Sequence, residues 1–168
     1  MVTVPPGGGA GESTERGSMR DVEVRRHVAA PVEQVWALAT DLAGAPRVVR
    51  GIEAVEVLTP GPFGVGTRWR ETRRMFGRSA TEEMTVTAVE PHRSYATEAS
   101  GPGVTYVSGF AFAPAAGGGT DVTATFGGRP TTTVGRVLAV LTGALGRRAI
   151  ARALAQDLAD IATAAERS

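Results

Sequence analysis

The chain contains no cysteine and no lysine, and only two histidines, His27 and His92. Without cysteine there are no disulfides, thiolate nucleophiles or cysteine-bound metals, and without lysine there is no Schiff-base chemistry. The two histidines fall in different predicted elements, so we expect no metal site. The glycine-rich segment 61–66 lies between two predicted strands and opens no helix, so it is not a dinucleotide site. We therefore expect no cofactor.

Charge of one sign and long apolar runs are also scarce. All 18 basic residues are arginine and they face 17 acidic residues, which gives a net charge of +1. This balance argues against bulk attraction to nucleic acid or to an anionic membrane. No uncharged apolar run approaches eighteen residues, and the N-terminus has no basic region followed by an apolar stretch. We expect a cytoplasmic protein with no stable membrane insertion and no nucleic-acid partner.

The first residues differ in composition from the rest. Residues 1–19 are rich in Gly, Pro, Ser, Thr and Glu, and such a segment buries too little apolar surface to offset the entropy of ordering. We expect a disordered tail there and a single domain over 20–168, which is long enough to form a core.

Apolar periodicity predicts one strand, short helices, a run of strands and a long helix. Pro31 suits the first turn of a helix whose buried stripe includes Val35 and Trp36, and a helical turn follows at 46–50. Alternating patterns separated by Gly and Pro predict the strands, and their short connections predict antiparallel neighbours. The strands are expected at 22–29, 52–58, 67–75, 81–90, 94–99, 104–112 and 120–126.

The long helix is predicted from Val134 to Glu166. Because neither a helix nor a sheet buries its apolar face alone, the helix must lie across the sheet. From Arg147 onward it alternates apolar positions with Arg152, Asp157 and Asp160, as expected for an ordinary clamp. The segment 134–146 is apolar almost all round and rich in glycine, so we favour a lid or cavity wall there. A dimer interface, a membrane contact and a plain break between two helices remain alternatives.

Several local patterns occur in an order that resembles a known superfamily. They are Pro31–Trp36 followed by Asp41 and Pro46, then Gly64–Trp69, Phe76–Arg78, Val89–Arg93, Gly119–Val122 and Gln156–Leu158. Over roughly residues 20–166 the chain resembles the START-related, Bet v 1-like proteins, and especially the bacterial polyketide cyclase/dehydrase and lipid-transport proteins. The resemblance implies an α+β helix-grip fold. In it, a curved antiparallel sheet of six or seven strands wraps a long C-terminal helix around an apolar cavity, with one or two short helices after the first strand.

Strand parity selects the side chains that would line this cavity, since residues two apart share a face of a strand. Val86 and Ala88 are expected on the inner face of one strand, and Tyr95 and Thr97 on that of the next. The candidate ligand-binding residues are Trp69, Met84, Val86, Tyr95, Tyr106, Phe110, Phe112, Leu138, Leu141 and Leu145.

Glu71 and Arg73 share one face of their strand with Trp69. If they face inward, they must be paired, because buried charges persist only with a partner. Such a pair could orient a polar ligand group or transfer a proton, so Glu71, Arg73 and Tyr106 are the candidate catalytic residues. The other interpretation is a solvated face of the strand, with Arg68 and Arg70 interleaved. We favour this second interpretation.

Three functions fit this sequence. The first is a module that binds a small hydrophobic molecule such as a lipid or polyketide, which matches an apolar cavity with few polar groups. The second is an enzyme of the polyketide cyclase or dehydratase type, which needs at least two polar groups that converge in the cavity. The third is a protein-interaction domain with a filled core. We rank them in that order and leave a homodimer open.

Overall fold

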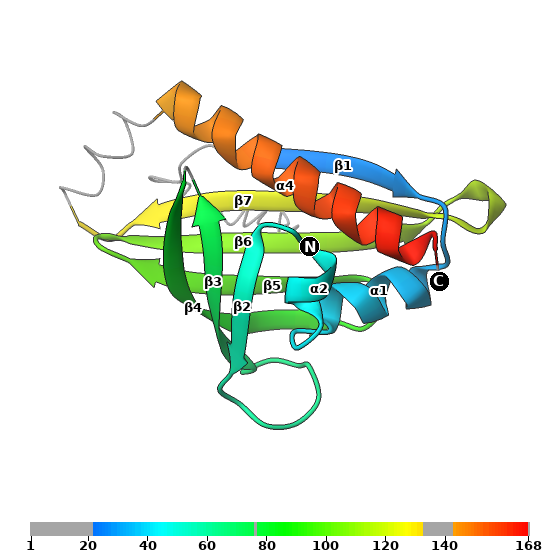
Figure 1. Cartoon of the computed structure of the whole chain (residues 1–168), viewed down its shortest axis with the longest axis horizontal. Coiled ribbons are helices and arrows are strands. Elements are labelled where there is room, and N and C mark those ends of the chain that lie inside the picture. The colour runs from blue at the N-terminus through cyan, green and yellow to red at the C-terminus, as the bar shows by residue number, and fades with distance from the viewer. Residues whose placement is uncertain (1–21, 76, 133–142, 168) are drawn as a thin grey trace, which may run out of the picture.

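A computed structural model describes residues 22–75, 77–132 and 143–167. It contains a seven-stranded sheet in the order β1-β7-β6-β5-β4-β3-β2, and all its neighbouring strands are antiparallel. Strands β2 and β3 run steeply across the direction of β6 and β7, so the sheet is strongly curved (Figure 1). The long helix α4 lies across its inner face. This is the helix-grip arrangement that the sequence predicts.

The elements follow the predicted order. Their bounds are β1 Val22–Val28, α1 Val32–Thr40, α2 Ala45–Val48, β2 Ile52–Val57, β3 Arg68–Met75, β4 Arg78–Glu90, β5 Ser94–Gly101, β6 Val104–Pro114, the 3-10 turn η1 Ala116–Gly118, β7 Thr120–Pro130 and α4 Gly143–Ala165. The predicted tail 1–19 and most of the apolar segment 134–146 lie outside the described residues.

The strands differ from their predicted bounds mainly at their ends. β4 begins at Arg78, three residues before the predicted start, and β7 continues to Pro130. These extensions carry charged or small residues, which hydrogen-bond through the backbone without an apolar alternation that a pattern search detects. Gly77 allows the tight β3–β4 turn, because its φ of 76° is a left-handed value that favours glycine.

One inward assignment is wrong. A register shift between Val86 and Ala88 marks a β-bulge in β4. The extra residue reverses the facing of the side chains beyond it. Val89 therefore pairs with the inward Tyr95, while Ala88 pairs with Ala96 and is exposed.

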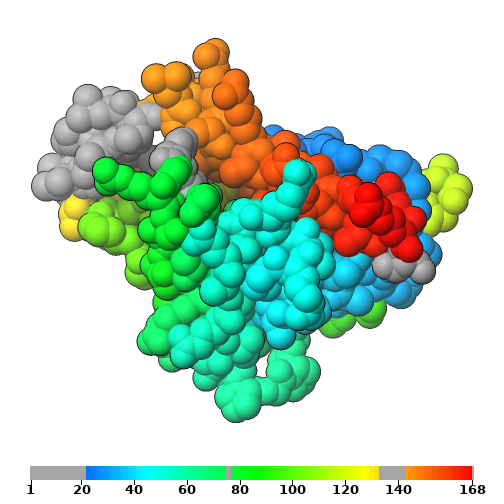
Figure 2. All heavy atoms as spheres, in the orientation of Figure 1, coloured from blue at the N-terminus to red at the C-terminus, as the bar shows by residue number. Residues whose placement is uncertain are grey.

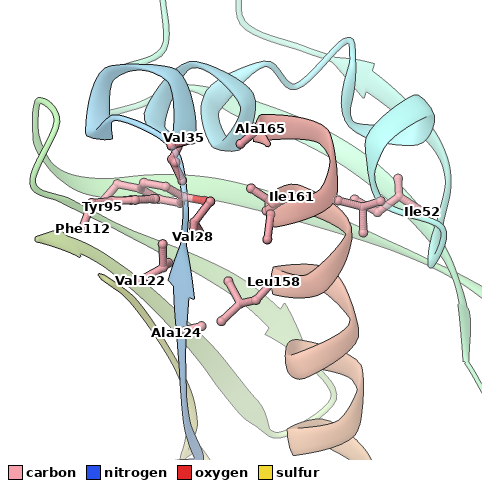
Figure 3. Close-up of a cluster of buried hydrophobic side chains, with 13 residues drawn as sticks. Val28, Val35, Ile52, Tyr95, Phe112, Val122, Ala124, Leu158, Ile161 and Ala165 are labelled. Carbon is pink, nitrogen blue, oxygen red and sulfur yellow. The ribbon is translucent and has the colours of Figure 1, made fainter. Parts of the chain in front are cut away.

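The hydrophobic core occupies one end of the interior, where α1 and the C-terminal half of α4 meet the sheet. Figure 3 shows Leu158 and Ile161 reaching from α4 toward strands that carry Val122 and Tyr95. The buried cluster consists of Val28, Ala30, Val35, Val49, Ile52, Tyr95, Phe112, Val122, Ala124, Leu158, Ile161, Ala162 and Ala165.

The two halves of α4 have different surroundings. Its C-terminal end is held by Gln34 Nε2, which donates to the carbonyl oxygen of Ala165 (2.7 Å), and by Glu166 Oε1, which accepts from the backbone N–H of Ala29 (3.0 Å). Its beginning is exposed, with Leu145 79% accessible, and Figure 2 shows these first turns projecting from the surface. None of the helices in the described ranges is long and apolar enough to span a bilayer.

Candidate functional site

Trp69, Glu71 and Arg73 all face the interior. Trp69 is only 5% exposed, and Glu71 and Arg73 share its face of β3 by parity. Their neighbours on the opposite face form exposed ion pairs, including Arg70 with Glu56. The interpretation that we favour from the sequence, a solvated face for Glu71 and Arg73, is therefore wrong. The strand is charged on both faces, so its pattern alone did not distinguish them.

Arg73 is held between two carboxylates. Its Nε donates to Glu71 Oε1 (2.5 Å) and its Nη2 donates to Asp157 Oδ2 (2.7 Å), so the guanidinium connects β3 to α4. Trp69 Nε1 donates to the other oxygen of Glu71 (3.2 Å). Burial favours the neutral form of Arg73, but the charges of Asp157 and Glu71 outweigh this effect and raise its pKa. Arg73 is therefore fixed in place as a cation.

For Asp157 the sequence predicts only an ordinary polar position of the clamp. Its side chain is 12% exposed and it contacts Arg73, which lies 84 residues earlier in the chain. The sequence does place Asp157 next to Leu158, a residue of the buried helical stripe, and an acid at such a position usually has a partner. A partner so distant in sequence is supplied only by the fold.

Asp160, one turn further along α4, is also buried, but its carboxylate has more hydrogen-bond donors around it than that of Asp157. It accepts hydrogen bonds from the backbone N–H of Arg50 (3.0 Å), from Arg50 Nε (3.0 Å) and from Gln156 Nε2 (3.0 Å). Burial opposes ionisation of both acids. Around Asp160 these hydrogen bonds overcome it and lower the pKa, whereas around Asp157 burial prevails over Arg73 and raises the pKa.

These opposite shifts predict opposite pH effects on stability. The folded state binds the Asp157 proton more tightly than the unfolded chain, so this contribution is present below the ordinary carboxyl pKa and is lost as pH rises through the raised value. Asp157→Asn should therefore gain in free energy of unfolding relative to wild type as pH rises from about 3.5 to 7. Asp160 stabilises the folded state above the ordinary carboxyl pKa, and this contribution is lost as pH falls through its lowered pKa. Asp160→Asn should therefore lose free energy of unfolding relative to wild type as pH rises through that range. Urea unfolding measures both effects if the pH series extends below the ordinary carboxyl pKa of about 3.9 for Asp160 and above it for Asp157. A relative loss for Asp157→Asn as pH rises would contradict the assignment.

Tyr95, Phe110 and Phe112 belong to an aromatic group near α1. The Tyr95 ring stacks on Phe110 at 4.9 Å and on Phe112 at 6.1 Å, and it meets the Trp36 ring edge-on at 5.9 Å. Its hydroxyl donates a long hydrogen bond to the carbonyl oxygen of Ala39 (3.4 Å). Burial and the nearby charges of Glu71 and Asp157 raise the pKa of Tyr95, which keeps the phenol neutral. Tyr95 and Phe112 are core residues.

At the opposite end of the inner face, the described residues are less deeply buried than in the core. The register places Tyr106 beside Ala99 and Ser108 beside Phe126, and the Tyr106 and Phe126 rings stack at 5.6 Å. Met84, Tyr106, Ser108 and Phe126 are all half-buried, and the hydrophobic ones, Met84, Tyr106 and Phe126, neither belong to the core cluster nor pack against it. Burial and the charge of Glu82 raise the pKa of Tyr106. Candidates Leu138 and Leu141 lie outside the described residues.

The sequence-predicted candidates thus divide into three groups. Trp69, Glu71 and Arg73 form one polar group with Asp157, while Tyr95 and Phe112 lie in the core. Met84 and Tyr106 lie at the opposite, half-buried end of the inner face. Val86 and Phe110 lie between them and the core along β4 and β6. Leu145 is exposed on the first turns of α4 and stands apart from all three groups.

A curved antiparallel sheet that grips one long helix, with polar groups set into an otherwise apolar interior, defines a helix-grip fold of the α+β class. The family model for "polyketide cyclase / dehydrase and lipid transport" matches residues 19–166, and the chain belongs to this family. No curated protein matches the chain.

Solved structures with this fold come from several bacteria. The chain is similar to the Zhui aromatase/cyclase from Streptomyces sp. R1128, with a TM-score of 0.71 and 22% identity, covering 88% of this chain and 94% of that one. It is also similar to a START superfamily protein from Mycobacterium smegmatis, with a TM-score of 0.71 and 14% identity over 88% and 97% of the two chains. A third is TTHA0849 from Thermus thermophilus, with a TM-score of 0.64 and 23% identity over 86% and 98%. At these identities the likeness shows the fold.

Proposed function

We propose that the protein binds a small apolar molecule between the inner face of the sheet and the first half of α4. One observation carries this proposal. The side chains of Met84, Tyr106 and Phe126 face inward and remain half-buried outside the core cluster. An inward apolar surface that the described core cluster does not cover is the kind of surface that ligand pockets provide.

The position of α4 supports the same proposal. The helix packs against β1, β7, α1 and α2, and its buried residues all lie in the C-terminal half. The first half extends past the core and carries exposed residues such as Leu145. A ligand bound between this half of the helix and the sheet would bury apolar surface on both sides, at about 25 cal/mol per Å² removed from water.

A neutral fluorescent probe tests this proposal. 1-N-phenylnaphthylamine carries no charge at neutral pH and gains fluorescence in apolar surroundings. We expect saturable binding of one probe per chain, with a dissociation constant in the micromolar range or below, about −8 kcal/mol or tighter. Fluorescence that does not saturate, or that saturates only at several probes per chain, would refute a defined site.

A second candidate function is polyketide cyclisation or dehydration, and the inward Glu71–Arg73 pair favours it. These two polar groups lie on the same face as Trp69, and the register places Tyr106 in the same row as Trp69 through Met84 and Ala99. If the protein is such an enzyme, Glu71→Gln should lower turnover of a poly-β-ketone by about a hundredfold, within the range for general acid–base groups. Probe binding should be unchanged, and full turnover in this variant would remove Glu71 from the reaction.

A further inference from the structure

The charge around Arg73 is out of balance. One guanidinium is bonded to two carboxylates, Glu71 and Asp157, whose side chains are 15% and 12% exposed. The group as a whole therefore carries one excess negative charge. Arg73 is a cation whose field is cancelled before any ligand arrives, because two opposite charges lie within hydrogen-bond distance of it.

The groups around this network do not restore the balance. Glu82, which is exposed, lies directly opposite Glu71 on the same face of the sheet and adds a further negative charge there. Asp160 is already neutralised by Arg50. Tyr95 stays neutral, and the other basic residues of matching parity, Arg26 and Arg78, are exposed at the sheet edge and at a hairpin end. Among the residues that the structure describes, the charges on the polar side of the interior are thus predominantly negative.

We propose that this excess makes Glu71 and Asp157 specificity-determining residues that disfavour anionic ligands. The ligand is then an apolar molecule whose polar end is neutral or cationic, such as an alcohol, a phenol, a ketone or an amine. A fatty-acid carboxylate would meet two carboxylates and a guanidinium that is already bonded to both. This inference rests on the proposed binding function and names the chemical class of its ligand.

A matched series of ten-carbon compounds tests the charge preference. Decanol, decylamine and decanoate share one alkyl chain, and at about pH 8 they are neutral, cationic and anionic. Each is titrated against the protein loaded with 1-N-phenylnaphthylamine. We expect decanol and decylamine to displace the probe and decanoate to bind at least about tenfold more weakly than decanol, the size of effect that one uncompensated charge produces at short range.

Charge variants separate the effect of the network's charge from other differences between the head groups of the three compounds. Glu71→Gln/Asp157→Asn leaves Arg73 unpaired and reverses the net charge of the network, so decanoate should then bind about tenfold more tightly than decanol. The single variant Asp157→Asn should fall between wild type and the double variant, which keeps the test valid if the double variant folds poorly. Glu83→Gln, on the outer face beside Arg68, should leave the order unchanged.

The outcomes separate the two claims. If decanoate binds wild type as tightly as decanol, or if Asp157→Asn leaves their ratio unchanged, the charge inference is wrong while ligand binding stands. If none of the three compounds displaces the probe and the probe itself does not bind, the proposed function fails, and the inference fails with it.

Discussion

Replacing Arg73 by methionine is expected to lower the free energy of unfolding by about 3 kcal/mol. Removing one member of a buried ion pair typically costs about 3–5 kcal/mol, because the remaining charge stays buried without compensation. Here two carboxylates, Glu71 and Asp157, lose their shared partner. The Arg73 side chain is 27% exposed, and water that reaches the site moderates the cost, which places the estimate at the lower end of that range. Urea unfolding of the variant measures the loss.

Two further variants isolate the cause of this loss. Arg70→Met removes an exposed arginine from the opposite face of the same strand, where it pairs with Glu56 at 3.1 Å, and should cost about 0.5 kcal/mol or less. The triple variant Glu71→Gln/Arg73→Met/Asp157→Asn removes both stranded charges and should recover most of the stability. Equal losses for Arg73→Met and Arg70→Met would show that the network is not buried in the way the structure describes.

Ser108→Trp is expected to weaken binding of the neutral probe by at least about a hundredfold. Ser108 faces inward on β6 between Thr97 and Phe126, at the half-buried end of the interior. An indole at this position would occupy the space assigned to the ligand, and overlap of this kind is not relieved by small shifts of a close-packed sheet. The fluorescence titration used for wild type measures the effect.

A matched substitution on the same strand provides the control. Ala111 lies on the outer face of β6 and is exposed, so Ala111→Trp adds the same indole outside the interior. We expect wild-type affinity for this variant and similar thermal midpoints for both. Unchanged binding in Ser108→Trp would place the ligand elsewhere, even if the protein binds the probe.

The sheet was largely predictable because side-chain alternation and turn residues are local features of the sequence. Alternation in β5 to β7 identified Tyr95, Thr97 and Phe112 as inward residues, and all three are buried. Turn residues such as Gly103 marked the hairpins, since its φ of 72° suits glycine. The β-bulge after Val86 was not predictable in this way, because no residue of that segment is specific to a bulge.

The polar network was only half predictable. The sequence predicts that Glu71 and Arg73 must be paired if they are buried, but the pattern of β3 places charged residues on both of its faces. The partner that fixes their orientation, Asp157, lies on α4, and its role depends on how the helix crosses the curved sheet. Local periodicity contains no information about that crossing, so the third member of the network emerged only from the fold.

The most direct test of the account is amide chemical-shift mapping with decanol, since it reports where a ligand lies and not only that it binds. We expect shifts concentrated on Met84, Ala99, Tyr106, Ser108 and Phe126 and on the first turns of α4, with little change at outward residues such as Ala111. Saturating shifts confined to the outer face of the sheet, or no shifts at decanol concentrations that displace the probe, would contradict it.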